Sequence, residues 1–141
     1  MKKVILYSES HNFQKLEFPE YIDHSNQAIV SRSIVDLAEA IDATAIVTET
    51  KSGATARQVA SKRNSRPIIA VTNDTRTSQQ LAIVYGIKSY VRPVDKMAAT
   101  KLTDWLQKQK ILSKGDLVVT ASGKQPGVIG TTDTIKVRLL D

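Results

Sequence analysis

The sequence predicts one α/β domain built around a largely parallel β-sheet. From residue 25 onward, stretches with apolar residues at helical spacing alternate with short apolar runs typical of buried strands. Helices that join consecutive strands favour parallel pairing, because each crossover returns the chain to the same end of the sheet. The length of 141 residues matches one domain. We therefore expect a single domain over residues 25–141, preceded by an N-terminal strand and arm over residues 1–24.

Five strands are expected from the short apolar runs. They cover residues 45–48, 68–71, 87–91, 117–121 and 135–139. The connection between the last two strands is too short to hold a crossover helix, so the last strand should be antiparallel to its neighbour. Residues 1–7 are also predicted to form a strand, because their apolar stretch is too short for the core of a secretory signal.

Four helices are expected between these strands. Ser25 or Asn26 suits the cap of the first helix. The second covers residues 54–63, and the third ends at Gly86, which allows a left-handed stop. The fourth covers residues 95–110 with Asp95 as its cap, and its Trp105 completes an apolar stripe. We interpret Trp105 as an anchor in the core or in an interface, not as a ligand-stacking residue.

Composition excludes several classes of protein. A hydrophobic fraction of 41% and a charged fraction of 24% are ordinary for a globular domain, and no apolar run is long enough to span a membrane. The absence of cysteine excludes disulfides and thiolate metal sites. A net charge of +6 with only 5% aromatic residues does not indicate a nucleic-acid-binding surface. A cytoplasmic protein without membrane or nucleic-acid partners is the expectation.

Catalytic and metal-binding motifs are missing from the sequence. His11 and His24 both lie in the N-terminal arm, without the spacing of paired metal ligands, and are interpreted as surface residues. No nucleophile elbow, Walker A loop or dinucleotide fingerprint is present. We therefore expect no catalytic residues, no metal and no cofactor.

Two polar loops that follow strands form the candidate site. Residues 50–55 join a buried strand to a helix N-terminus, where backbone N–H groups and the helix dipole favour anions. The second loop, residues 122–132, follows another strand at the same sheet edge, where open α/β folds bind ligands. Each loop by itself is also consistent with a simple turn. The candidate phosphate ligands are Thr50, Lys51, Ser52, Gly53, Thr55, Ser122, Gly123, Lys124, Gly127, Gly130 and Thr131.

Several motifs in a consistent order carry a family resemblance. They are Thr50-Lys51-Ser52-Gly53, Arg57-Gln58-Val59-Ala60, Pro67-Ile68-Ile69-Ala70-Val71-Thr72, Gly86-Ile87, Lys114-Gly115-Asp116-Leu117-Val118-Val119, Ser122-Gly123 and Gly130-Thr131-Thr132-Asp133-Thr134. Over residues 25–140 the sequence resembles the C-terminal domain of pyruvate kinase. This resemblance implies a three-layer α/β/α sandwich with a five-stranded mixed sheet whose last strand is antiparallel.

The resemblance also implies a regulatory role. In pyruvate kinases this domain binds an allosteric effector, commonly fructose 1,6-bisphosphate or another sugar phosphate. The loop that matches residues 50–55 holds one phosphate, and the loop that matches residues 122–130 closes over the sugar. Ala54 stands where some regulated relatives have a bulkier or basic residue. Candidate contacts to a second phosphate are Arg92, Lys96 and Lys124.

The catalytic part of that family does not fit within this chain. A (β/α)₈ barrel needs roughly 250 residues, more than the whole chain has. We therefore expect a non-catalytic module that binds a phosphorylated metabolite. It should form a homodimer through residues 134–139 or the helix of Trp105. One alternative is a structural subunit that oligomerises or docks on a separately encoded pyruvate kinase barrel. Another is an independent enzyme acting on phosphorylated compounds.

Overall fold

The computed structural model describes residues 2–11, 25–123 and 132–141. Its helices are α1 (Lys2–Ser10), α2 (Asn26–Ala40), α3 (Ala54–Ser61), α4 (Thr75–Leu81) and α5 (Ala98–Lys108). Its strands are β1 (Ala45–Glu49), β2 (Ile68–Thr72), β3 (Ile87–Val91), β4 (Leu117–Gly123) and β5 (Thr132–Leu139). The strands form one sheet in the order β3-β2-β1-β4-β5.

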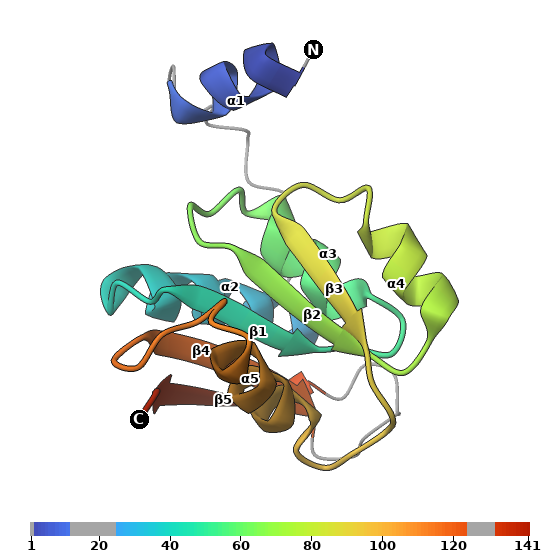
Figure 1. Cartoon of the computed structure of the whole chain (residues 1–141). Coiled ribbons are helices and arrows are strands. Elements are labelled where there is room, and N and C mark those ends of the chain that lie inside the picture. The colour runs from blue at the N-terminus through green and yellow to red at the C-terminus, as the bar shows by residue number, and fades with distance from the viewer. Residues whose placement is uncertain (1, 12–24, 124–131) are drawn as a thin grey trace.

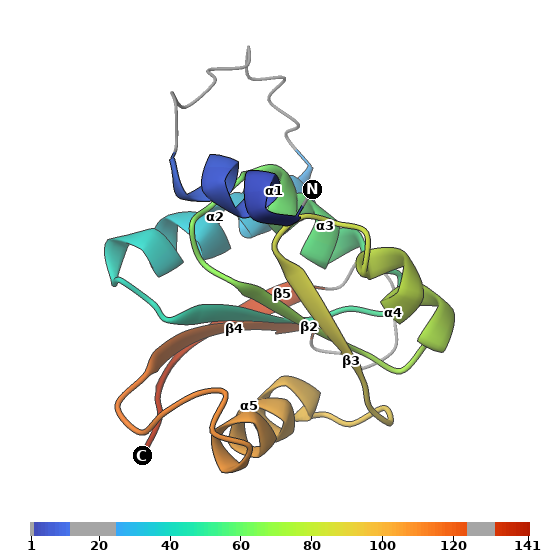
Figure 2. The same cartoon turned by 45° about the horizontal axis from the view of Figure 1, so that its top comes forward.

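Helices cover both faces of this sheet. α2, α3 and α4 lie on one face, and α5 lies on the other (Figures 1 and 2). β1 pairs in parallel with both β2 and β4, and β2 pairs in parallel with β3. β5 is antiparallel to β4. The predicted fold class, a three-layer sandwich with a mixed sheet and an antiparallel last strand, is therefore confirmed.

The core is divided by the sheet into two parts. Side chains alternate along β1, so Val47 packs on the α5 side and Ile46 on the side of α2 and α3. Both faces of β1 are buried, which explains its continuous apolar sequence. Trp105 on α5 is partly buried against the α5-side core, and its ring lies 5.6 Å from that of Tyr90 in an edge-to-face contact. This placement agrees with the anchoring role predicted for Trp105.

The N-terminal segment differs from its prediction. Residues 1–7 were expected to form a strand, whereas residues 2–10 form helix α1, which pairs with no strand of the sheet. A helix satisfies its backbone N–H and C=O groups within the segment, whereas a strand needs a neighbour for them. α1 leaves apolar side chains exposed, from 49% at Ile5 to 67% at Val4.

Two helix ends also differ from the predictions. α5 begins at Ala98 and has Met97 as its cap, so Asp95 is not the capping residue. Asp95 precedes the helix in a turn and accepts a hydrogen bond from the Met97 N–H at 2.8 Å. α4 ends at Leu81, and a further turn separates it from Gly86. Gly86 does have a left-handed φ of 75°, but it leads into β3 and does not stop the helix.

Candidate functional site

The loop between β1 and α3 turns sharply at Gly53. The Thr50 N–H first extends the pairing of β1 with β2 by donating to Val71 O at 2.9 Å. The chain then reverses, and Gly53 adopts a φ of 78° as the N-cap of α3. Only glycine adopts this left-handed conformation without a steric penalty. A Cβ at Gly53 would also lie 2.8 Å from Arg57 Nη1 and 3.1 Å from Leu81 Cδ2.

The start of α3 presents backbone donors without internal acceptors. Arg57 N makes the first hydrogen bond of this helix, to Gly53 O at 3.0 Å, so the N–H groups of residues 54–56 have no acceptor within the helix. Gly53 supplies no side-chain cap, and the first turn contains no acidic residue. The positive end of the helix dipole is therefore not balanced by a side chain of this loop.

Arg57 adds a positive charge to the same loop. Its guanidinium folds back across the turn, and Nη1 donates to Ser52 O at 3.1 Å. Arg57 is not among the site residues predicted from the sequence, because it lies on a helix four residues after Gly53 and not in the loop itself. The signal that was available is the spacing itself, because residues four apart lie on one side of a helix.

The loop is held in place by α4. The hydroxyl of Thr77, a residue only 5% exposed, donates to Lys51 O at 3.0 Å. The Lys51 side chain is exposed, and Ser52 is intermediate between exposed and buried. Thr77 is a second positioning residue that sequence analysis missed, because its partner lies 26 positions earlier in the chain.

The two predicted loops meet at a pair of threonines. Thr55 Oγ1 lies 2.8 Å from Thr132 Oγ1, which joins the start of α3 to the start of β5. Ser122 and Gly123 end β4, and the pairing with β5 is irregular between them. The start of α3 and the first residue of β5 are therefore in contact. Four predicted ligands, Lys124, Gly127, Gly130 and Thr131, lie outside the described residues.

The meeting point coincides with the reversal of strand order in the sheet. From β1 the chain adds β2 and β3 on one side, then returns through α5 to add β4 on the other side of β1. The loops after two parallel strands diverge at such a point, and open α/β sheets bind ligands in the crevice between them. Residues 50–55 follow β1, and residues after 123 follow β4.

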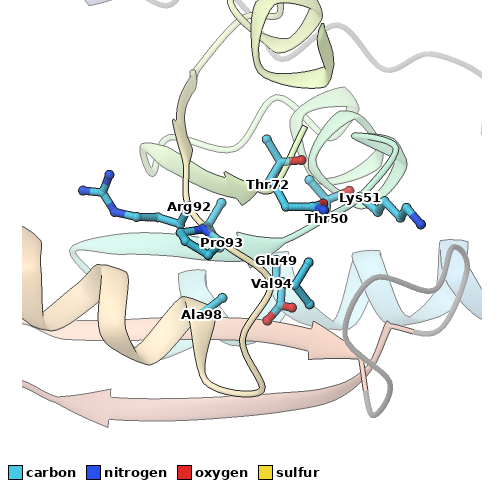
Figure 3. Close-up of a pocket in the computed structure, with 10 residues that line it drawn as sticks. Glu49, Thr50, Lys51, Thr72, Arg92, Pro93, Val94 and Ala98 are labelled. Carbon is cyan, nitrogen blue, oxygen red and sulfur yellow. The ribbon is translucent and has the colours of Figure 1, made fainter. Parts of the chain in front are cut away.

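A small pocket lies beside the loop that leads into α3, at the ends of β1, β2 and β3. Figure 3 shows several of its lining residues, which come from the ends of these strands, the segment after β3 and α5. The lining residues are Glu49, Thr50, Lys51, Val71, Thr72, Asn73, Arg92, Pro93, Val94 and Ala98. Thr50 and Lys51 thus belong both to this pocket and to the loop that leads into α3.

Glu49 is the unusual residue of the pocket. Burial raises the pKa of its carboxyl group above 4.5, and the charge of Asp95 raises it further. Asp95 itself has a lowered pKa, because Lys101 and the Met97 N–H donate hydrogen bonds to its carboxylate. The pocket therefore contains a partly buried carboxyl group, near the Asp95 carboxylate that is ion-paired with Lys101.

Among the basic residues expected to contact a second phosphate, Arg92 lines the pocket. The Arg92 guanidinium stacks over the Trp105 ring, 4.6 Å from its centroid, and Nη1 donates to Val91 O. Figure 3 shows Arg92 and Lys51 extending away from each other on opposite sides of the pocket. Lys96 is exposed on the segment before α5. Lys124 lies outside the described residues.

No metal centre is formed in the part of the chain that the structure describes, which contains no group of three histidine, cysteine or acidic side chains. His11 is an exposed residue whose ring stacks on that of Tyr7, at 4.0 Å between centroids. His24 lies outside the described residues. None of the described helices is long and apolar enough to cross a membrane.

These features define a doubly wound α/β domain with a glycine turn, contacted by the Arg57 guanidinium, at its switch point. The model of the family described as "Pyruvate kinase, alpha/beta domain" matches residues 28–138. The chain belongs to this family. The match confirms the resemblance inferred from the motifs.

Pyruvate kinases from several bacteria are similar to the chain. Pyruvate kinase 2 of Synechocystis is 37% identical over 114 residues, which cover 79% of this chain and 19% of that protein. The enzyme of Thermotoga maritima is 34% identical over 91% of this chain and 28% of its own length. The enzyme of Corynebacterium glutamicum is 28% identical over 99% of this chain and 30% of its own length. The chain thus spans less than a third of the length of these relatives.

Proposed function

We propose that this domain is a non-catalytic regulatory module that binds a phosphorylated metabolite in the crevice between the two loops. The observation that carries the proposal is the start of α3. There, N–H groups without acceptors in the helix, a glycine cap and the Arg57 guanidinium are gathered in one turn. Phosphate groups are favoured in such surroundings by hydrogen bonds and by the helix dipole.

Two further observations support this proposal. The loop lies at the switch point of the sheet, next to the loop that follows β4, so a ligand can be held from two sides. Ser52 adds a hydroxyl group and Lys51 an exposed ammonium group to the same turn. The relatives are pyruvate kinases, of which the chain matches the α/β domain.

Calorimetry with inorganic phosphate and glucose 6-phosphate tests the proposal. Ser52→Ala should weaken binding of both by about tenfold or more, the usual value of a hydrogen bond to a charged group. Lys51→Ala should have a smaller effect that shrinks as salt is added, because that side chain is solvated. Ser61→Ala is the matched control, since Ser61 lies at the opposite end of α3. Equal affinities in the Ser52 and Ser61 variants would contradict the proposal.

The second candidate function is structural, as an oligomerising or docking subunit. β5 is an edge strand of the sheet, and it exposes 47% of Val137 and 61% of Leu139. Exposed edges with apolar side chains are common sites of pairing between chains. Pairing across a two-fold axis would produce the homodimer expected from the sequence.

Light scattering at tens of micromolar tests this second candidate. A dimer is expected for the unaltered chain, and Val137→Glu should convert it to a monomer by placing charges opposite each other at the interface. Ile83→Glu is the control, because Ile83 is 91% exposed and lies away from β5, in the turn after α4. A monomer in the unaltered chain would rule out dimerisation, whereas a dimer that persists in both variants would rule out β5 as its interface.

A further inference from the structure

A second cavity lies at the end of the sheet opposite the loop between β1 and α3. Its lining comes from the first residues of β1, β2 and β3 and from the segment that follows α5. Because these three strands are parallel, their first residues share one edge of the sheet, and the loops after their last residues share the other. The cavity measures about 400 Å³, a usual size for a small-molecule site. None of the described residues of the candidate phosphate site lines it.

The walls of this cavity, which we call the apolar groove, are largely aliphatic. Ile69 and Leu112 are almost fully buried, at 6% and 4% exposed, whereas Ile111 is 47% exposed. Among the described helices, α5 alone covers this face of the sheet (Figure 2), and it packs on β1, β2 and β4. The chain turns after α5 at Lys110, which has a left-handed φ of 58°. The groove therefore lies beyond the end of α5, next to the start of the edge strand β3.

An aromatic side chain gives the groove one fixed wall. Tyr90 lines the groove, and its ring contacts the Trp105 ring edge to face, with 5.6 Å between the centroids. Trp105 is in turn covered by the Arg92 guanidinium, 4.6 Å from its centroid. These neighbours hold the Tyr90 ring in place before any ligand binds, which lowers the entropic cost of binding.

A single cation stands at this wall. Of the described residues that line the groove, Lys88 alone is charged, and its ammonium lies 5.6 Å from the centroid of the Tyr90 ring. Lys88 has no ion pair with the acidic residues that the structure describes. Thr44 also lines the groove, and its hydroxyl donates to the Asp116 carboxylate at 3.3 Å. An anion in the groove therefore meets one positive charge and no negative charge from the described lining.

We propose that the apolar groove binds a small monocarboxylate with an aromatic or branched apolar body. The body fills the space between Tyr90, Ile69 and Leu112, and the carboxylate pairs with the Lys88 ammonium. Burial of apolar surface supplies most of the affinity, while the exposed cation decides which charge is accepted. A second charged group on the ligand has no partner in the described lining, so dicarboxylates and zwitterions are disfavoured. This site is independent of the proposed function, because it lies at the opposite edge of the sheet.

Nuclear magnetic resonance titrations of the whole chain test this proposal. The probes 3-phenylpropionate and 3-phenylpropylamine have the same apolar body and opposite charges. The carboxylate should cause saturable shifts of the amide signals of Ile69, Lys88 and Ile111, and the amine should bind about fivefold more weakly or not at all. Lys88→Gln should weaken the carboxylate about fivefold and so remove this difference. Lys62→Gln is the matched control, since Lys62 is an exposed lysine at the end of α3, on the other face of the sheet.

A second variant changes the wall of the groove. Ile111→Asp introduces a carboxylate at an exposed lining position and should reverse the preference in favour of the amine. Ile83→Asp is its control, because Ile83 is 91% exposed and does not line the groove. The amide spectrum itself shows whether each variant is folded, and Lys88→Gln decides the question if Ile111→Asp is not.

Three results would overturn the proposal. The first is the absence of saturable shifts, or shifts confined to other parts of the chain. The second is a preference for the carboxylate that persists in Lys88→Gln. The third is a movement of the same amide signals with protein concentration in the absence of a probe, which would make the groove an interface between two copies of the chain.

Discussion

The loops that lead into α3 and α4 have the same place in the fold but opposite electrostatics. Each joins a buried parallel strand to the N-terminus of a short helix on the same face of the sheet (Figure 2). Before α4, the carboxylate of Asp74 accepts a hydrogen bond from the Arg76 N–H at 2.9 Å. Before α3, Gly53 offers no side chain, and an arginine covers the turn. One helix N-terminus is thus capped by a carboxylate, and the other has no side-chain cap.

The comparison extends to the other helices that follow a loop. Ser25 accepts the Ala28 N–H ahead of α2, whereas Met97, the N-cap of α5, makes no side-chain cap hydrogen bond. Among the described residues, no side-chain oxygen takes this role at α3. Glycine at the N-cap costs a helix only a few tenths of a kcal/mol relative to a capping side chain, so α3 forms without one.

The largest effect is expected from a side chain at Gly53. Gly53→Val should destabilise the fold by at least about 1–2 kcal/mol, because a left-handed φ is unfavourable for other residues. It should also abolish phosphate binding by displacing the Arg57 guanidinium. Gly86→Val is the matched control, since Gly86 has a similar φ of 75° but open space around its Cβ position. Chemical unfolding should show a lower stability in both variants. Calorimetry should show a loss of phosphate binding only in Gly53→Val.

An intermediate effect is expected at Asp74. Hydrogen bonds from the Thr77 hydroxyl and the Arg76 N–H lower the pKa of Asp74 below 3.8. A lowered pKa means that the carboxylate stabilises the folded state above pH 3.8, and that this contribution is lost as the pH falls through the folded-state pKa. Asp74→Ala should therefore lower the Tm at neutral pH. The Tm of this variant should converge with that of the unaltered chain as the pH falls through the lowered folded-state pKa, while phosphate binding stays unchanged.

The smallest effect is expected from a substitution of Glu49, and it concerns the stability of the fold. Its pKa is raised above 4.5, so its ionisation opposes folding as the pH rises through the folded-state pKa. Glu49→Gln should therefore raise the Tm at neutral pH by no more than about 4 °C, and the gain should vanish below pH 4.5. Melting curves between pH 3.5 and 8 measure this difference. A variant that is less stable than the unaltered chain at neutral pH would show that the carboxylate has a favourable partner in solution.

Local patterns in the sequence were sufficient for most of the fold. The central strands could be predicted because their continuous apolar runs reflect burial on both faces, as in residues 68–72. The helix at Asn26 could be predicted because Ser25 and the apolar stripe give its start and its buried side. The first helix could not, since residues 2–8 are exposed and no buried face imposes a period on them.

The candidate site was only partly determined by the sequence itself. The order of residues 50–55 predicted a glycine turn before a helix, because the φ requirement of Gly53 is a local property of the chain. The contacts of that turn with Thr77 and Thr132 depend on α4 and β5, which lie far away in the sequence. The direction of Arg92 toward Trp105, and the isolation of Glu49 beside Asp95, were likewise decided by packing between elements. Charge compensation depends on distances in space, so only the tertiary structure could show which charged groups of this site are paired and which are not.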